Sequence, residues 1–172
     1  MLKSHTENEY SASSDYETEA DDVWGKARDM NAQDSRQLVL ALHDIWNSGN
    51  VDEIPNVYAV DCTVHWAKGW GPESRGHSQI KDAILHTRRV FPDWHEDVLD
   101  MVVTFDKVVT RYCSTGTQHG EYLGIAPTGR KVAFEEISIY RIHQSRVVEQ
   151  WCLGDDLHCI EQLNSGADPH SG

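Results

Sequence analysis

Paired cysteines, long apolar runs and clustered basic residues are all missing from this sequence of 172 residues. Its cysteines, at positions 62, 113, 152 and 159, form no Cys-x-x-Cys pair, so neither a zinc knuckle nor a disulfide framework is indicated. No apolar run approaches the roughly 18 residues that span a bilayer, and the N-terminus lacks the order of a signal peptide. We therefore expect a soluble, cytoplasmic protein with no membrane partner, in a reducing compartment that suits free thiols.

Basic residues are outnumbered, with 15 Lys and Arg against 28 Asp and Glu and a formal net charge of -13. Nonspecific binding of nucleic acid depends on neutralising phosphates with Lys and Arg, and the sequence has no basic stripe. Its histidines include no pair at i, i+4 spacing beside a carboxylate, which a helical zinc motif requires. We expect neither a nucleic-acid partner nor a bound metal.

The N-terminal segment holds much of the acidic excess, because seven acidic residues and one lysine fall within the first 22 positions. A segment so polar cannot bury enough apolar surface to offset chain entropy, so residues 1–31 are predicted to be a disordered acidic tail. The remaining sequence has the length of one ordinary domain. We assign residues 32–165 to that domain and residues 166–172 to a flexible C-terminus.

Hydrophobic periodicity predicts helices first and strands afterwards. The helical patterns are a capped helix from Asp34 to the stop at Gly49, a short helix over 51–58, and a helix over 77–90 that Phe91-Pro92 ends. A brief strand over 62–66 and a loop over 68–76 separate the last two of these helices. Period-two segments follow at 95–105, 107–124, 131–142 and 146–154, and a short helix capped by Asp155 or Asp156 ends the pattern.

Turns between the long strands are predicted at 106–107, 126–129 and 143–145, the second because Pro127 and Gly129 suit a β-turn. This order of elements indicates the α+β class. We expect a cone in which a strongly curved antiparallel sheet wraps around three N-terminal helices. A cone of this kind has an open mouth and can hold a ligand.

Five signatures in order carry a resemblance to a known family. They are Asp61 to His65, Gly76 to Ile80, Phe91-Pro92-Asp93, the glycine-rich stretch from Gly116 to Arg130, and Trp151, Asp155, Gln162 and Leu163 near the end. Between about Asp34 and Leu163 the sequence resembles the SnoaL-like polyketide cyclase, or ester cyclase, branch of the nuclear transport factor 2-like superfamily. The resemblance implies the cone fold, a homodimer through the outer sheet face, and ring closure by proton transfer without metal or organic cofactor.

The sequence departs from that family at two positions. The family's catalytic aspartate on the last strand corresponds to Cys152, while Asp155 matches a second, less direct acid. The family's histidine in the glycine-rich stretch corresponds to Gln118, with His119 one place further on. A displacement of one residue on a strand sends the side chain to the opposite face.

Four residues are the candidate catalytic groups. Alternation over 133–141 puts Glu136 on the pocket side, where burial would make it a general acid or base, unless an arginine pairs with it in a structural bridge. Asp155 is either a helix N-cap or an acid at the pocket mouth. His65 matches a family histidine and suits proton transfer near neutral pH, and His119 or Gln118 would hydrogen-bond the oxygen on which negative charge develops.

Aromatic and polar side chains on the same faces are predicted to contact the substrate. Cys152 among them is expected to act as a small buried hydrophobe or, alternatively, as a nucleophile. The predicted substrate-binding residues are Trp66, Trp94, Tyr112, Gln118, Phe134, Ser138, Gln150, Trp151 and Cys152.

These observations predict a cofactor-independent enzyme for a small apolar, oxygenated metabolite of polyketide or terpenoid type. The expected reaction is cyclisation or isomerisation, with one pocket carboxylate removing a proton next to a carbonyl or from a hydroxyl. The alternative is a small-molecule-binding domain of the same fold without catalysis. A third interpretation, from Arg111 beside an aspartate, is a hydratase, dehydratase or epoxide-opening hydrolase.

Overall fold

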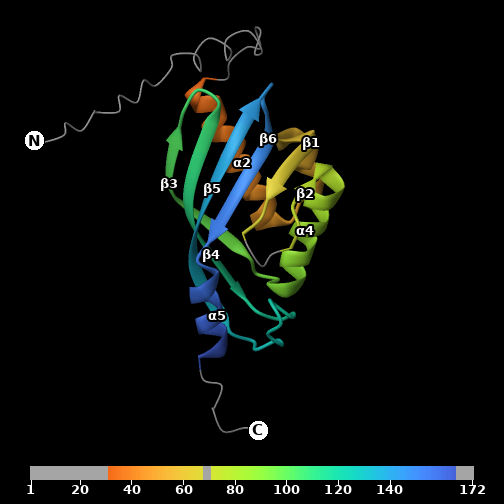
Figure 1. The fold of residues 1–172 in the computed structure, drawn as a ribbon, viewed down its shortest axis with the longest axis vertical. Coiled ribbons are helices and arrows are strands. Elements are labelled where there is room, and N and C mark those ends of the chain that lie inside the picture. The colour runs from red at the N-terminus through yellow and green to blue at the C-terminus, as the bar shows by residue number, and fades with distance from the viewer. Residues whose placement is uncertain (1–30, 68–70, 166–172) are drawn as a thin grey trace, which may run out of the picture.

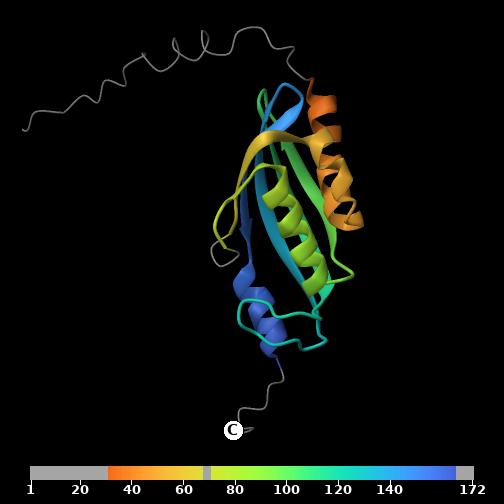
Figure 2. The same cartoon turned by 90° about the vertical axis from the view of Figure 1, so that its right-hand side faces the viewer.

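The computed structural model describes residues 31–67 and 71–165, which form one sheet with helices α2 and α4 on one of its faces (Figure 1, Figure 2). The predicted tail, apart from Asn31, and the predicted flexible C-terminus lie outside the described residues. The elements follow in the order α2 (Ala32–Ser48), η2 (Val51–Glu53), α3 (Ile54–Val57), β1 (Tyr58–His65), β2 (Ser74–Arg75), α4 (Gly76–Val90), β3 (His95–Val103), β4 (Lys107–Thr117), β5 (Lys131–His143), β6 (Arg146–Gly154) and α5 (Asp156–Asn164).

The sheet has six strands in the order β2-β1-β6-β5-β4-β3. Strands β3 to β6 form the expected antiparallel meander. The sheet is nevertheless mixed, because β1 runs parallel to β6 and places Val64 beside Gln150 and His65 beside Trp151. The α+β cone is therefore confirmed, with a parallel junction between segments that lie far apart in the sequence.

Helix α2 has the predicted stop but a different start. Its N-cap is Asn31, whose side-chain oxygen accepts a hydrogen bond from the backbone N–H of Asp34 at 2.9 Å. Gly49 ends the helix with a φ of 72° and donates its N–H to the carbonyl of Ile45 at 2.8 Å. This left-handed C-cap is the conformation that glycine adopts without steric cost.

Arg88 of α4 joins the two long helices. Its guanidinium donates to the carbonyls of Trp46 and Asn47 at 3.2 and 2.8 Å, and so satisfies acceptors that the end of α2 leaves unpaired. A Cβ on Gly49 would lie 2.6 Å from the Arg88 side chain. The close packing of the helix end against Arg88 therefore requires glycine here for a second reason.

The connection from β4 to β5 differs from the prediction. Strand β4 ends at Thr117 instead of continuing to residue 124, and the chain reverses at Leu123 and Gly124. Both have positive φ, 49° and 81°, as a two-residue type I′ turn requires. The segment 126–129 is irregular chain after that turn, whereas the turn predicted at 143–145 is confirmed.

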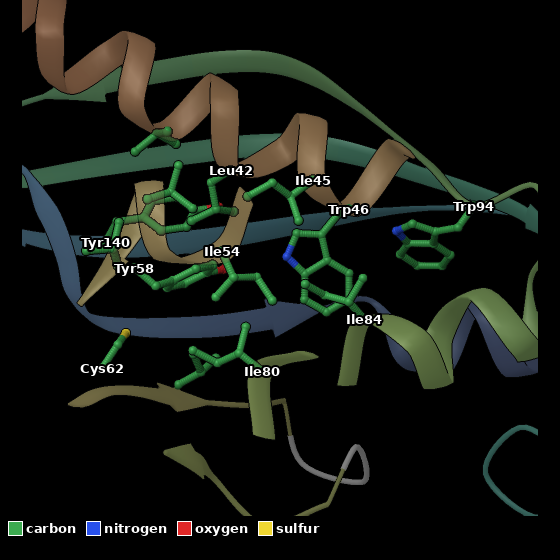
Figure 3. Packing of buried hydrophobic residues seen from close by; sticks show 14 of the residues in the cluster. Leu42, Ile45, Trp46, Ile54, Tyr58, Cys62, Ile80, Ile84, Trp94 and Tyr140 are labelled. Atoms are coloured by element: carbon green, nitrogen blue, oxygen red, sulfur yellow. The ribbon is translucent and has the colours of Figure 1, made fainter. Parts of the chain in front are cut away.

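The core fills the space between the helices and the concave face of the sheet. Side chains from α2, such as Leu42 and Trp46, meet Ile80 and Ile84 of α4 and the inner face of the strands (Figure 3). Strand β5 shows the predicted alternation. Its buried residues are Val132, Phe134, Glu136, Ser138, Tyr140 and Ile142.

Candidate functional site

A small cavity lies inside the cone, between α2 and the inner face of the sheet. Its volume is about 30 Å³, which is room for roughly one or two water molecules. Two carboxylates, Glu96 of β3 and Glu136 of β5, line it among mostly apolar and aromatic side chains. The other lining residues are Leu42, Trp46, Trp66, Ala67, Trp94, Tyr112, Tyr140, Gln150 and Cys152.

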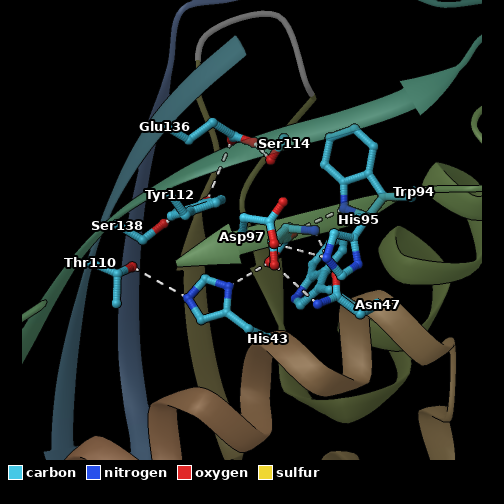
Figure 4. Close-up of polar contacts among 12 residues, drawn as sticks. His43, Asn47, Trp94, His95, Asp97, Thr110, Tyr112, Ser114, Glu136 and Ser138 are labelled. Carbon is cyan, nitrogen blue, oxygen red and sulfur yellow. Dashed lines mark hydrogen bonds and ion pairs between the residues drawn. The ribbon is translucent and has the colours of Figure 1, made fainter. Parts of the chain in front are cut away.

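Glu136 is a carboxyl group held by neutral hydroxyls. Only 8% of it is exposed, Ser114 Oγ donates to Oε1 at 2.5 Å, and Tyr112 OH lies 3.5 Å from Oε2 (Figure 4). Burial, followed by the nearby charge of Glu96, raises the pKa of Glu136 from 4.5 to about 8. Gly154 of β6 is the register partner of Glu136. A Cβ at position 154 would lie 3.3 Å from the Glu136 carboxyl group, so glycine leaves room for that group.

The alternative role of Glu136, a structural ion pair with an arginine, is not observed among the described residues. Arg111 pairs with the neighbouring Glu135 at 3.0 Å, on the opposite face of β5. In the part of the chain that the structure describes, no arginine forms an ion pair with Glu136. The residue is therefore a buried titratable group beside a cavity.

Glu96 is fixed at both of its oxygens. Trp94 Nε1–H donates to Oε1 at 3.0 Å, and His43 Nδ1 lies 2.6 Å from Oε2. The side-chain amide of Asn47 bonds the backbone N–H and C=O of Glu96 at 2.7 and 3.1 Å, which ties β3 to α2 (Figure 4). Glu96 thus has little freedom to turn away from the cavity.

The second ring nitrogen of His43 extends this network across the cone. His43 is 3% exposed, and its Nε2 lies 3.1 Å from the hydroxyl of Tyr140 and 3.4 Å from that of Thr110. The hydroxyls of Thr110 and Tyr140 are 3.3 Å apart. His43 therefore connects two groups that line the cavity, Glu96 and Tyr140, without lining it itself.

The sequence patterns did not single out His43 or Glu96. A signal was present for each of them. His43 lies four residues after Val39 and three before Trp46, on the apolar stripe of its helix, where a polar residue must find a partner. Glu96 lies two residues after Trp94, on the same face of a half-buried strand.

A family model described as SnoaL-like polyketide cyclase matches residues 36–163. The chain belongs to this family. A comparison with curated proteins finds no match. A similar solved structure is that of IdmH from Streptomyces antibioticus, a candidate polyketide cyclase, which is 28% identical over 77% of this chain and 99% of its own, with a TM-score of 0.68.

Two further solved structures show the same fold at lower identity. TsrD from Streptomyces laurentii is 24% identical over 79% of this chain and 98% of its own, with a TM-score of 0.72. AclR from Streptomyces galilaeus, a candidate hydroxylase, is 22% identical over 80% of this chain and 85% of its own, with a TM-score of 0.68. IdmH is described as a candidate cyclase and AclR as a candidate hydroxylase. The SnoaL-like fold alone therefore does not determine the reaction.

Cys152 lines the cavity of this SnoaL-like protein. Tyr58 OH donates to Gln150 Oε1 at 3.0 Å, and Gln150 Nε2 donates to the Cys152 sulfur at 3.1 Å. Burial raises the pKa of the Cys152 thiol to about 12. The Cys152 thiol is therefore neutral near pH 7. Because the thiolate is the nucleophilic form, this environment does not favour a nucleophilic role for Cys152.

His65 and Trp151 are not brought to the cavity. They stack on each other with ring centroids 5.4 Å apart, and His65 bonds Glu149 at 2.9 Å and Glu73 at 3.2 Å. His65 and Trp151 are register partners, and each directly follows an inward-facing residue, Val64 or Gln150, so both lie on the outer face. The catalytic role expected for His65 has no support from its position.

Asp155 lies on the surface at the start of α5. Its side chain accepts a hydrogen bond from the backbone N–H of His158 at 3.1 Å, which is the N-cap interaction weighed above as its structural role. Asp155 does not line the cavity. Of the two predicted carboxylates, only Glu136 is in the cavity lining.

Gln118 points into the fold and His119 points out to solvent. Gln118 is fully buried, but its amide is occupied by the returning segment of the β4–β5 connection. Its Nε2 donates to the carbonyl of Ile125 at 3.0 Å, and its Oε1 accepts from the backbone N–H and the hydroxyl of Thr128 at 3.0 and 2.6 Å. Neither Gln118 nor His119 lines the cavity.

The other predicted substrate contacts lie in or beside the cavity. Trp66, Trp94 and Tyr112 line it, as do Gln150 and Cys152 described above. Phe134 packs under Trp94 with ring centroids 6.0 Å apart, and Ser138 bonds the hydroxyl of Tyr112 at 3.1 Å. These two form the buried support of the lining.

Over residues 31–67 and 71–165, no group of three or more His, Cys, Asp or Glu side chains is arranged to hold a metal ion. Within the same residues, none of the helices combines the length and the apolar character needed to cross a bilayer.

Proposed function

We propose that this protein is a cofactor-independent enzyme that transfers protons on a small, oxygenated and largely apolar metabolite. Isomerisation or ring closure next to a carbonyl is the reaction. The observation that carries this proposal is the Glu136 carboxyl group, buried beside an aromatic-lined cavity and held only by hydroxyls. Membership of the SnoaL-like polyketide cyclase family supports the same class of chemistry.

Glu136 suits the role of general acid near neutral pH. Because its pKa is raised to about 8, most of the population carries the proton at pH 7. A protonated carboxyl in an apolar cavity can donate to a carbonyl oxygen as negative charge develops there. The hydroxyls of Ser114 and Tyr112 hold the group and stabilise the carboxylate that remains.

The cavity must widen to admit a metabolite, because its volume of about 30 Å³ holds roughly one or two water molecules. Trp66 and Cys152 are the lining residues that are not fully buried. Trp66 is the larger, and its Nε1–H donates to the hydroxyl of the short Ser74 side chain at 2.9 Å. Rotation of Trp66 is the simplest movement that opens the cavity.

The proposal is tested with 3-cyclohexen-1-one, whose conversion to conjugated 2-cyclohexen-1-one moves a proton away from the carbon next to the carbonyl. The ultraviolet absorbance of the conjugated ketone measures turnover. We expect Glu136→Gln to lower the rate by about 10²- to 10⁴-fold, the range for removing a general acid or base. Glu135→Gln is the matched control, since Glu135 is the adjacent residue on the opposite, exposed face. Full activity of Glu136→Gln would contradict the proposal.

A second candidate function is binding of a small molecule without turnover. Cys152 in place of the family's aspartate and the small cavity favour it. Phenol, a planar ring with one oxygen, is a suitable probe, and NMR chemical shifts of the tryptophan indole N–H groups report binding. Saturable binding of phenol without any enone turnover by the wild-type protein would decide for this alternative.

We also propose a homodimer through the outer face of the sheet. Ile137, Ile139 and Leu153 are 45%, 37% and 70% exposed, and they lie together on β5 and β6. Charged pairs such as Arg111 with Glu135 border this apolar surface, and a two-fold axis would allow opposite charges to meet. Leu153→Lys should convert a dimer to a monomer in light scattering, whereas a monomeric wild-type protein would refute the assembly.

The cytoplasm is the compartment we propose. All four cysteines are free thiols, which suits a reducing environment.

A further inference from the structure

A buried hydrogen-bond network beside the cavity does not include Glu136. His43 bonds Glu96 through Nδ1 at 2.6 Å and faces the hydroxyl of Tyr140 through Nε2 at 3.1 Å. Both ends of this chain, Glu96 and Tyr140, line the cavity, while His43 lies behind them. An imidazole bonded at both nitrogens can accept a proton at one and is stabilised at the other.

The direction of each hydrogen bond follows from the donors present. The Trp94 indole N–H can only donate, so Oε1 of Glu96 accepts. The relay requires Oε2 of Glu96 to accept as well, so that His43 carries its proton on Nδ1 and Nε2 accepts from Tyr140. The Tyr140 oxygen then keeps lone pairs for a proton arriving from the cavity or for the hydroxyl of Thr110, 3.3 Å away.

We propose that Tyr140, His43 and Glu96 form the proton acceptor that works opposite Glu136. The Tyr140 oxygen takes the substrate proton while its own proton passes to Nε2 of His43, and Glu96 stabilises the resulting imidazolium. This inference rests on the function proposed above, because it supplies the base for the same reaction. Tyr140 would be the catalytic residue, and His43 and Glu96 would act through it.

The proton balance closes within the cavity. The C–H bond next to the substrate carbonyl breaks, an O–H bond forms on Tyr140, and the former Tyr140 proton forms an N–H bond on His43. Glu136 gives its proton to the carbonyl oxygen, so the substrate becomes a neutral enol. Tyr140 then gives a proton to another carbon and regains one from His43, while the enol O–H returns its proton to Glu136, which completes an isomerisation and restores every group.

The surroundings of His43 favour this arrangement. The ring is packed against the edge of Tyr112, with centroids 4.8 Å apart, and against Tyr140, with Thr110 at its Nε2 side. Glu96 is the only carboxylate that bonds it among the described residues. Burial also raises the pKa of Tyr140 well above its ordinary value, so the resting phenol keeps its proton until the relay moves it.

The first test is independent of turnover. Long-range ¹⁵N–¹H NMR of the wild-type protein at pH 7 should show a neutral His43 with its proton on Nδ1. In Glu96→Gln the amide carbonyl still accepts from Trp94, so the amide N–H₂ faces Nδ1 and should move the His43 proton to Nε2. This change of tautomer would show that Glu96 sets the protonation site of His43, and the turnover test below shows whether the reaction depends on it.

The second test uses 3-cyclohexen-1-one turnover. Glu96→Gln and Tyr140→Phe should each lower kcat by roughly a thousandfold or more, the scale seen when the wrong histidine tautomer blocks a relay in the Ser-His-Asp triad. Tyr122→Phe is the matched control, since Tyr122 is 6% exposed and its hydroxyl contacts Asp156 at 3.4 Å, away from the cavity. Thermal unfolding midpoints separate these effects from loss of folded protein.

Two outcomes would overturn the relay. One is a wild-type His43 that carries its proton on Nε2, and this result stands even where Glu96→Gln does not fold. The other is unchanged turnover in Tyr140→Phe while Glu136→Gln is inactive, which would leave the proposed function standing with another base. Full activity of Glu136→Gln would instead remove the proposed function itself.

Discussion

The buried Glu136 carboxyl should make the protein less stable as pH rises. Its folded-state pKa is about 8 against an ordinary 4.5, so the folded state holds a proton that the unfolded chain has already released. The stabilisation is fully present below pH 4.5 and is lost as pH rises to about 8. At about 1.4 kcal/mol per unit of pKa, the loss is about 5 kcal/mol as an upper figure.

The substitution Glu136→Gln tests this prediction because glutamine resembles the protonated carboxyl and does not titrate. Urea unfolding at pH 4, 7 and 9 should give nearly equal stabilities for the two proteins at pH 4. At pH 9 the variant should be the more stable by about 3–5 kcal/mol. The same variant should have lost enone turnover, so the residue would destabilise the fold while serving the reaction.

Glu135→Gln is the control for the stability experiment also. Glu135 is exposed and paired with Arg111 on the outer face, so its variant should follow the pH dependence of the wild-type protein. Parallel stability curves for Glu136→Gln and wild type between pH 4 and 9 would refute the reasoning. They would mean that the Glu136 carboxyl titrates as it does in the unfolded chain.

Three further predictions concern single side chains. Arg88→Ala should destabilise the protein by about 1–3 kcal/mol in urea unfolding, because two carbonyls at the end of α2 lose their charged donor; an unchanged midpoint would contradict this. Gln118→Ala should speed proteolysis of the segment 119–130, mapped by mass spectrometry, since three hydrogen bonds that hold that segment are removed. Cys152, with a pKa of about 12, should react with iodoacetamide at pH 8 far more slowly in the folded protein than in urea, and equal rates would contradict the raised pKa of the folded thiol.

Local patterns predicted most of the fold because each depends on a few neighbouring residues. The alternation along β5 was enough to put Glu136 on the inner face, and the break between two period-two segments was enough to predict the turn at 143–145. The turn after β4 was wrongly predicted at 126–129 because the actual turn requires a positive φ at Leu123, and leucine rarely adopts a positive φ. Its conformation depends instead on the tertiary bonds that Gln118 makes to the returning chain.

The parts of the candidate site that could not be predicted depend on contacts between segments far apart in the sequence. His65 could be assigned to a strand but not to a face, because its orientation depends on the parallel register of β1 with β6, and those strands are far apart in sequence. His43 and Glu96 come from α2 and β3, and nothing in either segment alone specifies that Nδ1 of one will lie 2.6 Å from the other. Local alternation can place a side chain on one face of a strand. The contact between His43 and Glu96 depends on how α2 packs against β3, which local alternation does not specify.

The position of Cys152 gains a structural explanation from the register of β5 and β6. Cys152 pairs with Ser138 and Gly154 pairs with Glu136, so the cysteine and Glu136 are diagonal neighbours on the same inner face. Diagonal neighbours lie about 7–8 Å apart, so the Glu136 carboxyl on β5 reaches the same part of the cavity as the side chain at position 152 on β6. An aspartate at 152 beside Glu136 would put two like charges in one apolar cavity, where only one could ionise readily. A small neutral thiol at 152 and a hydrogen at Gly154 instead leave that space to Glu136, so acid–base chemistry in this cavity would come from β5 and not from β6.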